Sequence, residues 1–286
     1  MSKRPAIVAN SRNPKAVAAA GELLQFFEAA GARPLLEPEL APLLDRVDLA
    51  ASPESVREQA EIVISLGGDG TILRAARMLF PKVVPVLGLN LGRLGFLAHS
   101  SADDLRQIAS RALVGDFQTE DRLVLETRSD VPENGPLYAL NEFAVHHGLL
   151  SRTIRIELSL DNRPLRRYHA DGVIVASPTG STAYSLAAGG PVVAPDVPAV
   201  VVAPICAHGL AERPVVVSAD HQIGLKLIQN SESVHLVVDG QSGEPLIVGQ
   251  EVKIGVASFP FRIASIGDID FFRALREKMG WGDRPV

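Results

Sequence analysis

The chain has 286 residues, of which 47% are hydrophobic, which is enough to bury one large core or two smaller ones. Its 28 Lys and Arg against 33 Asp and Glu give a net charge of −5 without a long run of one sign, so the composition gives no indication of nucleic-acid binding. A single cysteine, Cys206, excludes a disulfide framework or a cysteine-rich zinc site, and its apolar surroundings in the sequence predict a buried, inert thiol.

Neither a signal peptide nor a membrane span is expected. The apolar run before Asn10 is too short for the core of a signal peptide. The long apolar region 173–207 is interrupted by several prolines and by Asp196, which disfavours a membrane span. We therefore expect a cytoplasmic protein that binds neither membranes nor nucleic acids.

Residues 1–115 read as a Rossmann-like α/β domain. The runs "AIVA", "RPLLE", "EIVISL" and "VVPVLGL" are predicted strands, and helical patterns lie between them. Asn13 is the expected N-cap of the first helix and Gly31 marks its end, while Ser101, with Asp104 three residues later, is expected to open another helix. Strands that alternate with helices in this way predict a parallel sheet with helices on both faces.

Residues 116–266 have a different pattern, with many short β-rich segments and no helices of comparable length between them. The predicted strands include "RLVLETR", "TIRIELSL", "SVHLVVDG", "PLIVG", "EVKIGV" and "FRIASI". The dipeptide "DN" at Asp161 and the stretch "GQSGEP" at Gly240 are expected to be connections. Regular strands of this kind predict an antiparallel second domain.

The chain ends in a predicted helix, "DIDFFRALREKMGW". The residues that recur at helical intervals in this stretch are Ile269, Phe272, Leu275, Arg276 and Met279. Because an all-β domain offers little for a single helix to pack on, we expect residues 267–286 to return to the α/β domain.

Candidate chemistry begins at the glycine-rich turn that follows the strand "EIVISL". Gly67, Gly68 and Gly70 permit positive φ and let a polyanion approach the backbone, while Thr71 is expected to open a helix whose positive end favours phosphate. Asp69 then lies beside a phosphate site. The alternative is a simple turn, since the stretch is neither a Walker loop nor a dinucleotide fingerprint.

A second glycine-rich stretch, "GLNLGRLGFLA" over residues 88–98, follows the next predicted strand. It is expected at the same edge of the sheet as the first turn. The alternative is a loop that leaves the strand and buries Phe96 and Leu97 in the core.

A polar pair, Asn141 and Glu142, interrupts the strand-like segment "LNEFAVHHG" and needs hydrogen-bond partners there. The adjacent His146 and His147 resemble metal ligands at first sight. Neighbouring residues of a strand point to opposite faces, so we expect surface or hydrogen-bonded histidines instead.

The longest polar stretch is "HADGVIVASPTGSTAYSLAAGGPVV", residues 169–193. It places Asp171 before a strand and follows the strand with hydroxyl-bearing and small residues suited to a polar ligand. Tyr184 offers a ring that can stack on a base or fill a core. The alternative is a helix cap, and no pattern makes Ser181 or Ser185 a catalytic serine, which disfavours a hydrolase.

Taken in this order, these stretches resemble the ATP-dependent NAD kinases. The resemblance covers residue 61 to the C-terminus and rests on "GGDGT", "LGRLGFL", the Asn-Glu pair, "DGVIVASPTGSTAYSLAAGGP", "PICAHGL", "VDGQ" and "FFRALREKMGW". The chain departs from the family pattern at Gly209, where a hydroxyl or other small residue is common.

The resemblance implies transfer of the γ-phosphoryl group of ATP to the 2′-hydroxyl of the adenosine ribose of NAD, which gives NADP. It implies that Asp69 orients or deprotonates the attacking hydroxyl, that Asn141 and Glu142 bind the adenosine half of the dinucleotide, and that Asp171 lies near the nicotinamide. The substrate- and cofactor-binding residues expected in all are Gly67, Gly68, Gly70, Thr71, Arg74, Phe96, Asn141, Glu142, Asp171, Thr182, Ala183, Tyr184, Ser185 and Asp239.

The resemblance also implies Mg²⁺, held mainly by the nucleotide phosphates and water, and a homodimer or homotetramer. Two alternatives stay open from the residues alone. A lipid kinase of the diacylglycerol or sphingosine type shares the glycine-rich Asp turn, although the helix "ILRAAR" and the hydroxyl-rich stretch are not typical of it. A non-catalytic dinucleotide-binding regulator would keep the same residues.

Overall fold

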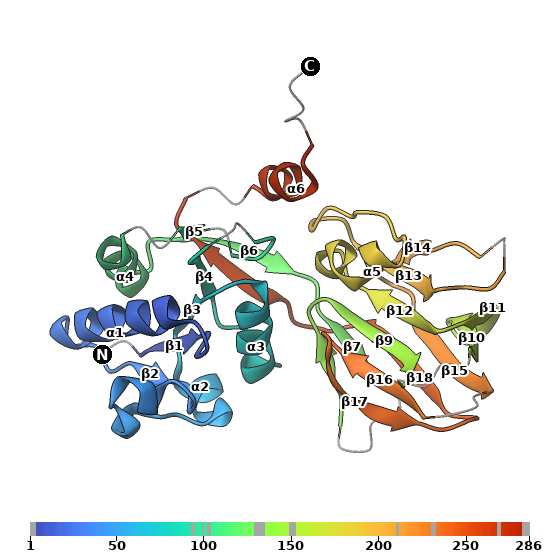
Figure 1. Ribbon diagram of the computed structural model, residues 1–286, viewed down its shortest axis with the longest axis horizontal. Helices are drawn as coiled ribbons and strands as arrows, with labels where there is room; N and C mark the ends of the chain where they lie inside the picture. The colour runs from blue at the N-terminus through green and yellow to red at the C-terminus, as the bar shows by residue number, and fades with distance from the viewer. Residues whose placement is uncertain are drawn as a thin grey trace. The chain divides into compact units, whose positions relative to one another are not determined.

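The computed structural model describes residues 4–92, 95–98, 100–101, 104–128, 135–148, 153–209, 212–229, 233–267 and 270–281. The chain forms two compact units (Figure 1). Unit 1 consists of Met1–Asp121 and Phe261–Val286, and unit 2 consists of Arg122–Pro260. We describe each unit by itself.

Unit 1 is built on one sheet with the strand order β2-β1-β3-β4-β19-β6 and with β5 paired to β4. Its strands are β1 (Pro5–Ala9), β2 (Leu35–Leu36), β3 (Ile62–Leu66), β4 (Val86–Asn90), β5 (Ser100–Ser101), β6 (Gln118–Arg122) and β19 (Phe261–Ser265). The pairs β1–β2, β1–β3 and β3–β4 are parallel, as the sequence predicts. The pairs β4–β5 and β4–β19 are parallel as well, but the sequence did not predict these two strands in this sheet.

Helices cover both faces of this sheet. The helices of unit 1 are α1 (Pro14–Ala29), α2 (Pro53–Gln59), α3 (Asp69–Leu79), α4 (Leu105–Val114), α6 (Phe271–Met279) and the short 3-10 helices η1 (Ala41–Leu44) and η2 (Val47–Leu49). Leu87 and Leu89 of β4 share a core cluster with apolar residues of α1 and α4. Gly88 points the other way, where an added Cβ would lie 2.5 Å from the side chain of Ile72 on α3.

The helix ends follow local capping chemistry. Asn13 caps α1 by accepting a hydrogen bond from the backbone N–H of Lys15 at 3.0 Å, and Gly31 follows the helix with a φ of +75°. The predicted start of α4 at Ser101 is wrong, because Asp104 accepts from Gln107 N at 2.9 Å and Ser101 is extended in β5.

Unit 2 contains two antiparallel sheets among the described residues, with strand orders β11-β10-β15-β18-β7-β8 and β14-β13-β12-β9-β16-β17. Its strands are β7 (Leu125–Thr127), β8 (Tyr138–Ala139), β9 (Glu142–His147), β10 (Ile154–Leu160), β11 (Arg163–Ala170), β12 (Gly172–Ala176), β13 (Ala199–Ile205), β14 (Val215–Ser218), β15 (Ile223–Gln229), β16 (Val234–Val238), β17 (Gln241–Leu246) and β18 (Glu251–Val256). The predicted antiparallel β domain is confirmed.

The central strands β12 and β13 of the second sheet of unit 2 are buried on both faces. Val173 and Val175 of β12 enter the large core that they share with apolar residues of the first sheet. Ile174 and Ala176 point the opposite way into a small cluster with Val193. The 3-10 helix η3 (Thr179–Thr182) and helix α5 (Tyr184–Ala187) lie in the segment that leads from β12 to Val193.

Two connections differ from the prediction. The stretch "QSGEPL" forms strand β17, and the turn consists of Asp239 and Gly240, with φ of +46° and +69°. The predicted strand "PLIVG" ends at Leu246, and the exposed Ile247 and Val248 follow it. The turn at Asp161 and Asn162 is confirmed, with φ of +50° and +62°.

The division between the units also differs from the expected boundaries at 115/116 and 266/267. Strand "FRIASI", expected in the antiparallel domain, is β19 and pairs in parallel with β4 of unit 1. Arg262 of β19 donates to both carboxylate oxygens of Asp121 on β6, at 2.7 and 2.9 Å. Because β6 and β19 complete the sheet of unit 1, this unit extends to Asp121 and begins again at Phe261.

The terminal helix α6 belongs to unit 1, as predicted. Its buried residues are Phe271, Ala274 and Leu275. The predicted apolar stripe is therefore partly wrong, since Phe272 is 62% exposed. Ile269 lies outside the described residues.

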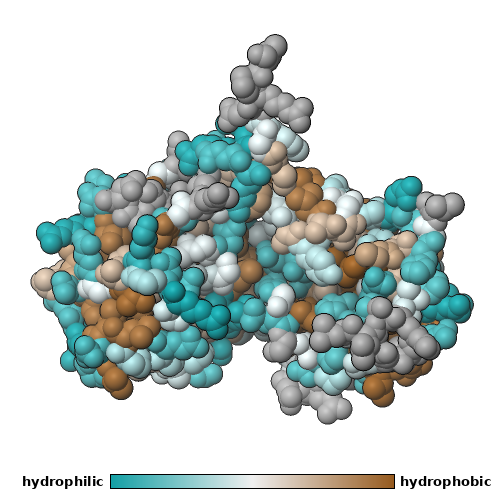
Figure 2. Space-filling model, in the orientation of Figure 1, coloured by the Kyte–Doolittle hydropathy of each residue, from teal (hydrophilic) through white to brown (hydrophobic). Residues whose placement is uncertain are grey.

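Hydrophilic and hydrophobic residues intermingle on the face of the molecule in Figure 2. Within the part of the chain that the structure describes, every helix is too short or too polar to cross a membrane.

Candidate active site

The glycine-rich turn connects β3 to α3 in unit 1. Gly67 has a φ of +153°, and an added Cβ there would lie 2.4 Å from Thr71 Oγ1, so the position requires glycine. Gly68 is the N-cap of α3 and has open space where its side chain would be. The helix begins at Asp69, two residues before the predicted Thr71, so Asp69 and Gly70 form its first turn. The backbone N–H groups of this turn therefore lie at the positive end of a helix.

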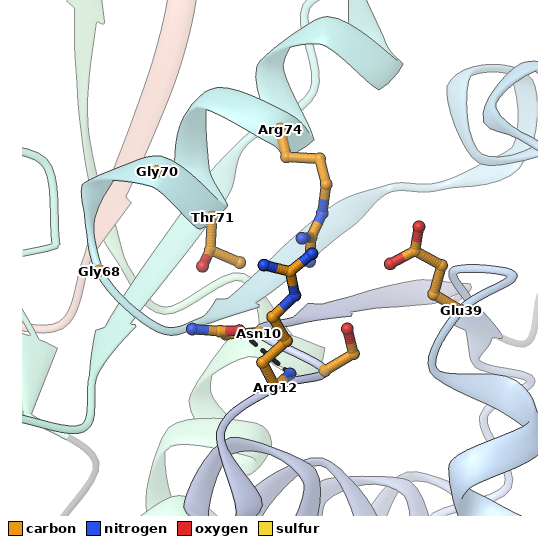
Figure 3. A pocket seen from close by; sticks show the side chains of 8 residues that line it. Asn10, Arg12, Glu39, Gly68, Gly70, Thr71 and Arg74 are labelled. Carbon is orange, nitrogen blue, oxygen red and sulfur yellow. Dashed lines mark hydrogen bonds between the residues drawn. The ribbon is translucent and has the colours of Figure 1, made fainter. Parts of the chain in front are cut away.

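A pocket of about 550 Å³ opens beside the start of α3 (Figure 3). It is lined by Asn10, Ser11, Arg12, Glu39, Gly68, Gly70, Thr71 and Arg74. Two guanidinium groups and a helix N-terminus in one pocket form a site for a polyanion.

Arg74 is held in place by the buried carboxylate of Glu37. Its guanidinium donates to Glu37 Oε1 at 2.9 Å, and the backbone N–H of Ala9 donates to the same oxygen at 2.7 Å. This anchoring fixes the direction in which the Arg74 side chain enters the pocket.

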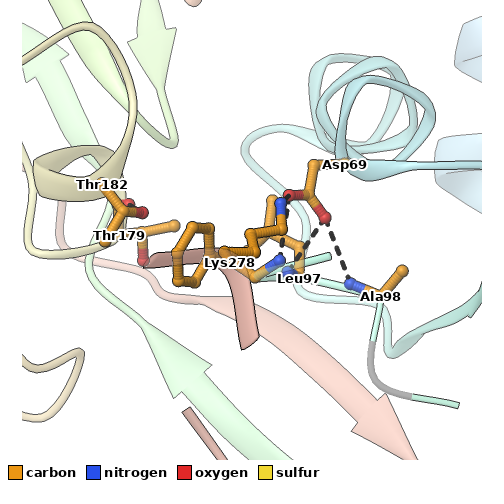
Figure 4. Close-up of polar contacts among 7 residues, drawn as sticks. Asp69, Leu97, Ala98, Thr179, Thr182 and Lys278 are labelled. Carbon is orange, nitrogen blue, oxygen red and sulfur yellow. Dashed lines mark hydrogen bonds and ion pairs between the residues drawn. The ribbon is translucent and has the colours of Figure 1, made fainter. Parts of the chain in front are cut away.

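The Asp69 carboxylate is surrounded by donors (Figure 4). Oδ2 accepts from Phe96 N at 3.0 Å, and Oδ1 accepts from Leu97 N at 3.0 Å and from Ala98 N at 3.4 Å. Lys278 Nζ lies 3.4 Å from Oδ2. The two glycine-rich stretches of the sequence thus meet at this carboxylate.

Close packing makes this contact possible. An added Cβ at Gly95 would lie 2.0 Å from Asp69 Oδ1. Leu97 is buried, as the alternative interpretation expected, whereas Phe96 is only half-buried. The Phe96 ring packs at 6.0 Å from the ring of Phe271 on α6.

In unit 2, Asp239 holds the backbone of the polar pair. Its carboxylate accepts from Leu140 N, Asn141 N and Glu142 N at 3.0, 2.8 and 3.1 Å. Both of its oxygens are therefore engaged by the chain itself. Contact of Asp239 with the dinucleotide stays a prediction, and the structure assigns it a positioning role.

The hydroxyl-rich segment packs directly on the polar pair. Ser177 N donates to Asn141 O at 2.8 Å, and Ser177 Oγ donates to Leu140 O at 2.5 Å. An added Cβ at Gly180 would lie 2.1 Å from Asn141 O. Gly180 is thus required by the close approach of two backbones.

Glu142 is the most perturbed carboxyl group of the candidate site. It is 5% exposed, and its Oε2 has no hydrogen-bond partner among the described residues. Burial, reinforced by the negative charge of Asp239, raises the pKa of Glu142 to about 8, although the Tyr184 N–H donates to its carboxylate. Glu142 therefore holds a proton at neutral pH.

Tyr184 is the first residue of α5, and its side chain is 42% exposed. Burial raises the pKa of its phenol, and the neighbouring acidic groups add to the effect. The exposed ring is available for stacking. Thr182, half-buried, donates its hydroxyl to Thr179 O at 3.1 Å, and Ala183 separates the two short helices.

Two serines of this segment are internal. Ser181 Oγ donates to Pro178 O at 2.6 Å and accepts from Val193 N at 2.9 Å, which ties both ends of the segment together. Ser185 is fully buried. Its predicted role in substrate binding therefore requires a ligand that reaches beneath the surface, and it stays a prediction.

Asp171 and the nearby His146 and His147 are half-buried. His147 Nε2 lies 3.6 Å from Asp171 Oδ1, and the His146 ring donates to His147 O at 2.7 Å, which confirms hydrogen-bonded histidines. The prediction for Cys206 is wrong, since its side chain is exposed. Cys206 has a φ of +47° just after β13, where the chain turns away from the sheet.

Within unit 1 the structure brings Asp69, Thr71, Arg74 and the glycines to the start of one helix, with Phe96 on the loop that binds Asp69. Within unit 2 it joins the polar pair, Asp239 and Tyr184. Sequence reasoning missed Arg12, Glu37 and Lys278. A signal for Lys278 exists, since it lies seven residues after Phe271 on the same helical face.

The chain matches two family models in succession. Residues 6–117 match the ATP-NAD kinase N-terminal domain, and residues 140–266 match the ATP-NAD kinase C-terminal domain. The two matched ranges correspond closely to the α/β part and the β-rich part of the fold.

Curated relatives are similar over nearly their whole length. An NAD kinase of Geobacter sp. (strain M21) is 40% identical over 289 residues, which cover 99% of this chain and 100% of the relative. An NAD kinase of Symbiobacterium thermophilum is 40% identical over 278 residues, covering 96% and 98% of the two chains.

Two solved structures of NAD or NADH kinases have a similar fold. A yeast NADH kinase complexed with NADH superimposes with a TM-score of 0.90 at 26% identity, covering 100% of this chain and 89% of the other. An NAD kinase from Archaeoglobus fulgidus in complex with ATP has a TM-score of 0.74 at 28% identity, and 97% of each chain is covered. The chain therefore belongs to the ATP-NAD kinase family, the phosphotransferases that use ATP to phosphorylate NAD.

Proposed function

We propose that this chain transfers the γ-phosphoryl group of ATP to the 2′-hydroxyl of the adenosine ribose of NAD, with Asp69 as the group that accepts the hydroxyl proton. A bond forms between the ribose oxygen and the γ-phosphorus as the bond to the bridging oxygen breaks, and ADP leaves. The observation that carries this proposal is the position of the Asp69 carboxylate. Asp69 lies at the start of α3, beside the pocket that contains Arg12 and Arg74, and the backbone N–H groups of Phe96 and Leu97 hold its carboxylate in place.

Asp69 acts by position and late proton transfer. A ribose hydroxyl is too weak an acid to lose its proton to an ordinary carboxylate before attack, so the proton moves as the new bond to phosphorus forms. The hydrogen bonds from Phe96 N and Leu97 N fix the carboxylate, which reduces the reorganisation needed during the reaction.

The pocket beside α3 is proposed to bind the phosphates of ATP. Arg12 and Arg74 would neutralise phosphate charge, and the backbone N–H groups from Gly68 to Thr71 would donate hydrogen bonds. The Archaeoglobus relative, which was solved with ATP, supports a nucleoside triphosphate as the ligand of this fold.

Gly68→Val tests this assignment. Gly68 has a φ of −91° and open space around its missing side chain, so valine should fit the fold while it fills the phosphate pocket. We expect the KM for ATP to rise at least about 10-fold with an unchanged melting temperature, since even one lost phosphate contact is worth about 1.5–3 kcal/mol. An unchanged ATP affinity would mean that the phosphates of ATP do not bind in this pocket.

Unit 2 is proposed to bind the dinucleotide. Tyr184 presents a partly exposed ring for stacking, and Asn141 and Glu142 offer polar groups for the adenosine half. Thr182 and Ala183 would line the same site, with Asp171 toward the nicotinamide. The yeast relative, solved with NADH, supports a nicotinamide dinucleotide as the ligand.

Mg²⁺ is proposed to arrive with the nucleotide. Among the described residues there is no group of three or more His, Cys, Asp or Glu that could hold a metal ion. Glu39 and Asn10 offer oxygen ligands in the ATP pocket, which fits an ion that keeps most of its water and phosphate ligands. The ion would neutralise phosphate charge. A cytoplasmic location, expected from the sequence pattern, and a homodimer or homotetramer, implied by the family resemblance, complete the proposal.

A coupled assay tests the function directly. The purified chain is incubated with ATP, Mg²⁺ and NAD, and NADP is measured with an NADP-specific dehydrogenase. Sustained NADP formation is expected. NAD binding without turnover would indicate a regulator, and phosphorylation of diacylglycerol or sphingosine in vesicles would indicate a lipid kinase.

A further inference from the structure

Lys278 lies at the Asp69 carboxylate, although the proposed reaction does not yet use it. Its Nζ is 3.4 Å from Asp69 Oδ2 and 4.5 Å from the centroid of the Phe96 ring (Figure 4). The ammonium thus lies at the carboxylate and makes a cation–π contact with the ring at the same time.

The position of Lys278 is fixed by the packing of α6. Phe271, Ala274 and Leu275 are buried, and Lys278 follows them at the spacing that keeps all four on one face of the helix. The Phe271 ring packs on Phe96, which anchors the start of the helix. Lys278 is exposed, as are Arg273, Arg276 and Glu277, and its ammonium reaches Asp69 from the end of the buried stripe. A lysine that ends the buried stripe, directly at the candidate base, is therefore placed by the fold.

The lone pairs of Asp69 are fully used in this state. An ionised carboxylate offers about four acceptor sites. Three are taken by the backbone N–H groups of Phe96, Leu97 and Ala98, and the fourth by the Lys278 ammonium. A hydroxyl that is to give its proton to Asp69 must displace one of these donors.

Lys278 is the donor that can leave. The three N–H groups belong to a loop that is packed against Asp69, whereas the ammonium ends a flexible four-carbon stem. Its ion pair with Asp69 is partly exposed, with side-chain exposures of 35% and 28%, and such pairs exchange readily.

We propose that Lys278 is a further active-site residue: its ammonium occupies Oδ2 of Asp69 in the resting enzyme and moves to the phosphoryl oxygens when the acceptor hydroxyl takes its place. This inference rests on the proposed function of Asp69. No proton leaves Lys278 in this step. The hydroxyl proton goes to Asp69 as the oxygen–phosphorus bond forms, and the ammonium neutralises charge on the phosphoryl group as ADP leaves.

Four variants test this role. Lys278→Met keeps the apolar stem and removes the charge, Lys278→Arg keeps the charge, and Lys278→Ala leaves room for an added amine. Arg276→Met removes an exposed charge two residues earlier on the same helix and is the matched control. Steady-state kcat, both KM values and the melting temperature are measured for each variant.

We expect Lys278→Met to lower kcat by about 10²-fold, the lower end of the effect of removing one transition-state donor. The KM for NAD and the melting temperature should stay close to those of Arg276→Met. Lys278→Arg should recover most of the lost rate, and ethylammonium in the buffer should raise the kcat of Lys278→Ala but not that of Arg276→Met.

The inference would be overturned by a kcat of Lys278→Met within about 2-fold of the control, the level at which exposed ion pairs act. Equal losses in the Met and Arg variants without rescue by the amine would overturn it as well, because a structural role would then explain them. Asp69→Asn separates the two proposals. If Asp69→Asn keeps its kcat, the proposed function of Asp69 is wrong. If Asp69→Asn is inactive but Lys278→Met is fully active, only the proposed role of Lys278 is wrong.

Discussion

The two carboxyl groups that matter most lie in opposite surroundings. In unit 1, Asp69 is 28% exposed and receives three backbone N–H groups and an ammonium. In unit 2, Glu142 is almost fully buried, lies near a second carboxylate, and leaves one oxygen without a partner among the described residues. Donors stabilise the ionised form of a carboxyl group, and burial beside a like charge stabilises the neutral form.

The different surroundings suit the two carboxyl groups to different proposed roles. Backbone donors hold the Asp69 carboxylate in one orientation, which suits its proposed role as proton acceptor. Glu142, with its pKa raised to about 8, can instead donate a hydrogen bond at neutral pH. A neutral acid suits the recognition of an acceptor atom on a ligand, and it adds no negative charge beside the phosphates of a dinucleotide. Residue type alone would not have separated these roles.

The largest effect is expected from Gly95→Ala, which acts on Asp69 without changing it. The added Cβ would lie 2.0 Å from Asp69 Oδ1, so the carboxylate must leave its backbone donors. We expect kcat to fall by about 10²–10⁴, as for the loss of a positioned base. Gly92→Ala is the control, since open space surrounds that position. Equal activity of the two variants would contradict the fixed geometry of Asp69.

Glu142→Gln is expected to change the pH dependence of stability. The folded chain keeps the Glu142 proton up to about pH 8, whereas the unfolded chain releases it near the ordinary value of 4.5. Glu142 therefore stabilises the folded state most below the unfolded value, and this contribution is lost as the pH rises toward the folded value. Glutamine resembles the protonated acid at every pH.

The free energy of unfolding measured from about pH 5 to about pH 9 checks this prediction. Glu142→Gln should match the wild type at the acidic end and exceed it by a few kcal/mol at the alkaline end, with about 1.4 kcal/mol for each unit of pKa difference. A constant difference between the two proteins over this range would mean that Glu142 is ionised throughout.

A smaller effect is expected from Tyr184→Ala. Stacking on a base is worth about 1–3 kcal/mol, so the KM for NAD should rise about 10-fold while the KM for ATP changes little. Since Tyr184 is 42% exposed, the loss of stability should stay well below the roughly 3–5 kcal/mol of an emptied core site. A large fall in melting temperature with unchanged NAD kinetics would make Tyr184 a packing residue.

Local patterns predicted much of the fold. Alternating strands and helices identified the parallel sheet, and the capping chemistry of Asn13 placed the first helix correctly. The segments that failed depend on distant partners. "FRIASI" pairs with β4 far upstream, and "QSGEPL" becomes a strand because β16 lies beside it. Cys206 follows an apolar strand, but a turn with positive φ exposes it.

In the candidate site, too, the sequence could not predict contacts between residues that are far apart in the chain. The sequence pointed to Asp69, the polar pair and Tyr184 as candidates because glycine turns and polar residues in apolar runs are local signals. It could not show that Gly95 packs on Asp69, that Asp239 holds the backbone of the polar pair, or that Lys278 reaches Asp69. Each of these contacts joins residues that are far apart in the sequence, and only tertiary packing creates them.

The most direct test of the account is the kcat of Asp69→Asn with saturating ATP and NAD. Asparagine keeps the shape of the side chain and one oxygen for the backbone donors but cannot accept the hydroxyl proton. The account predicts a kcat about 10²–10⁴ lower, equivalent to roughly 3–5 kcal/mol of barrier, with both substrate affinities nearly unchanged. A kcat preserved within a few-fold, or a loss confined to the KM values, would contradict the account. Asp69 would then be a substrate-binding residue or a structural residue of the turn and would not accept the proton.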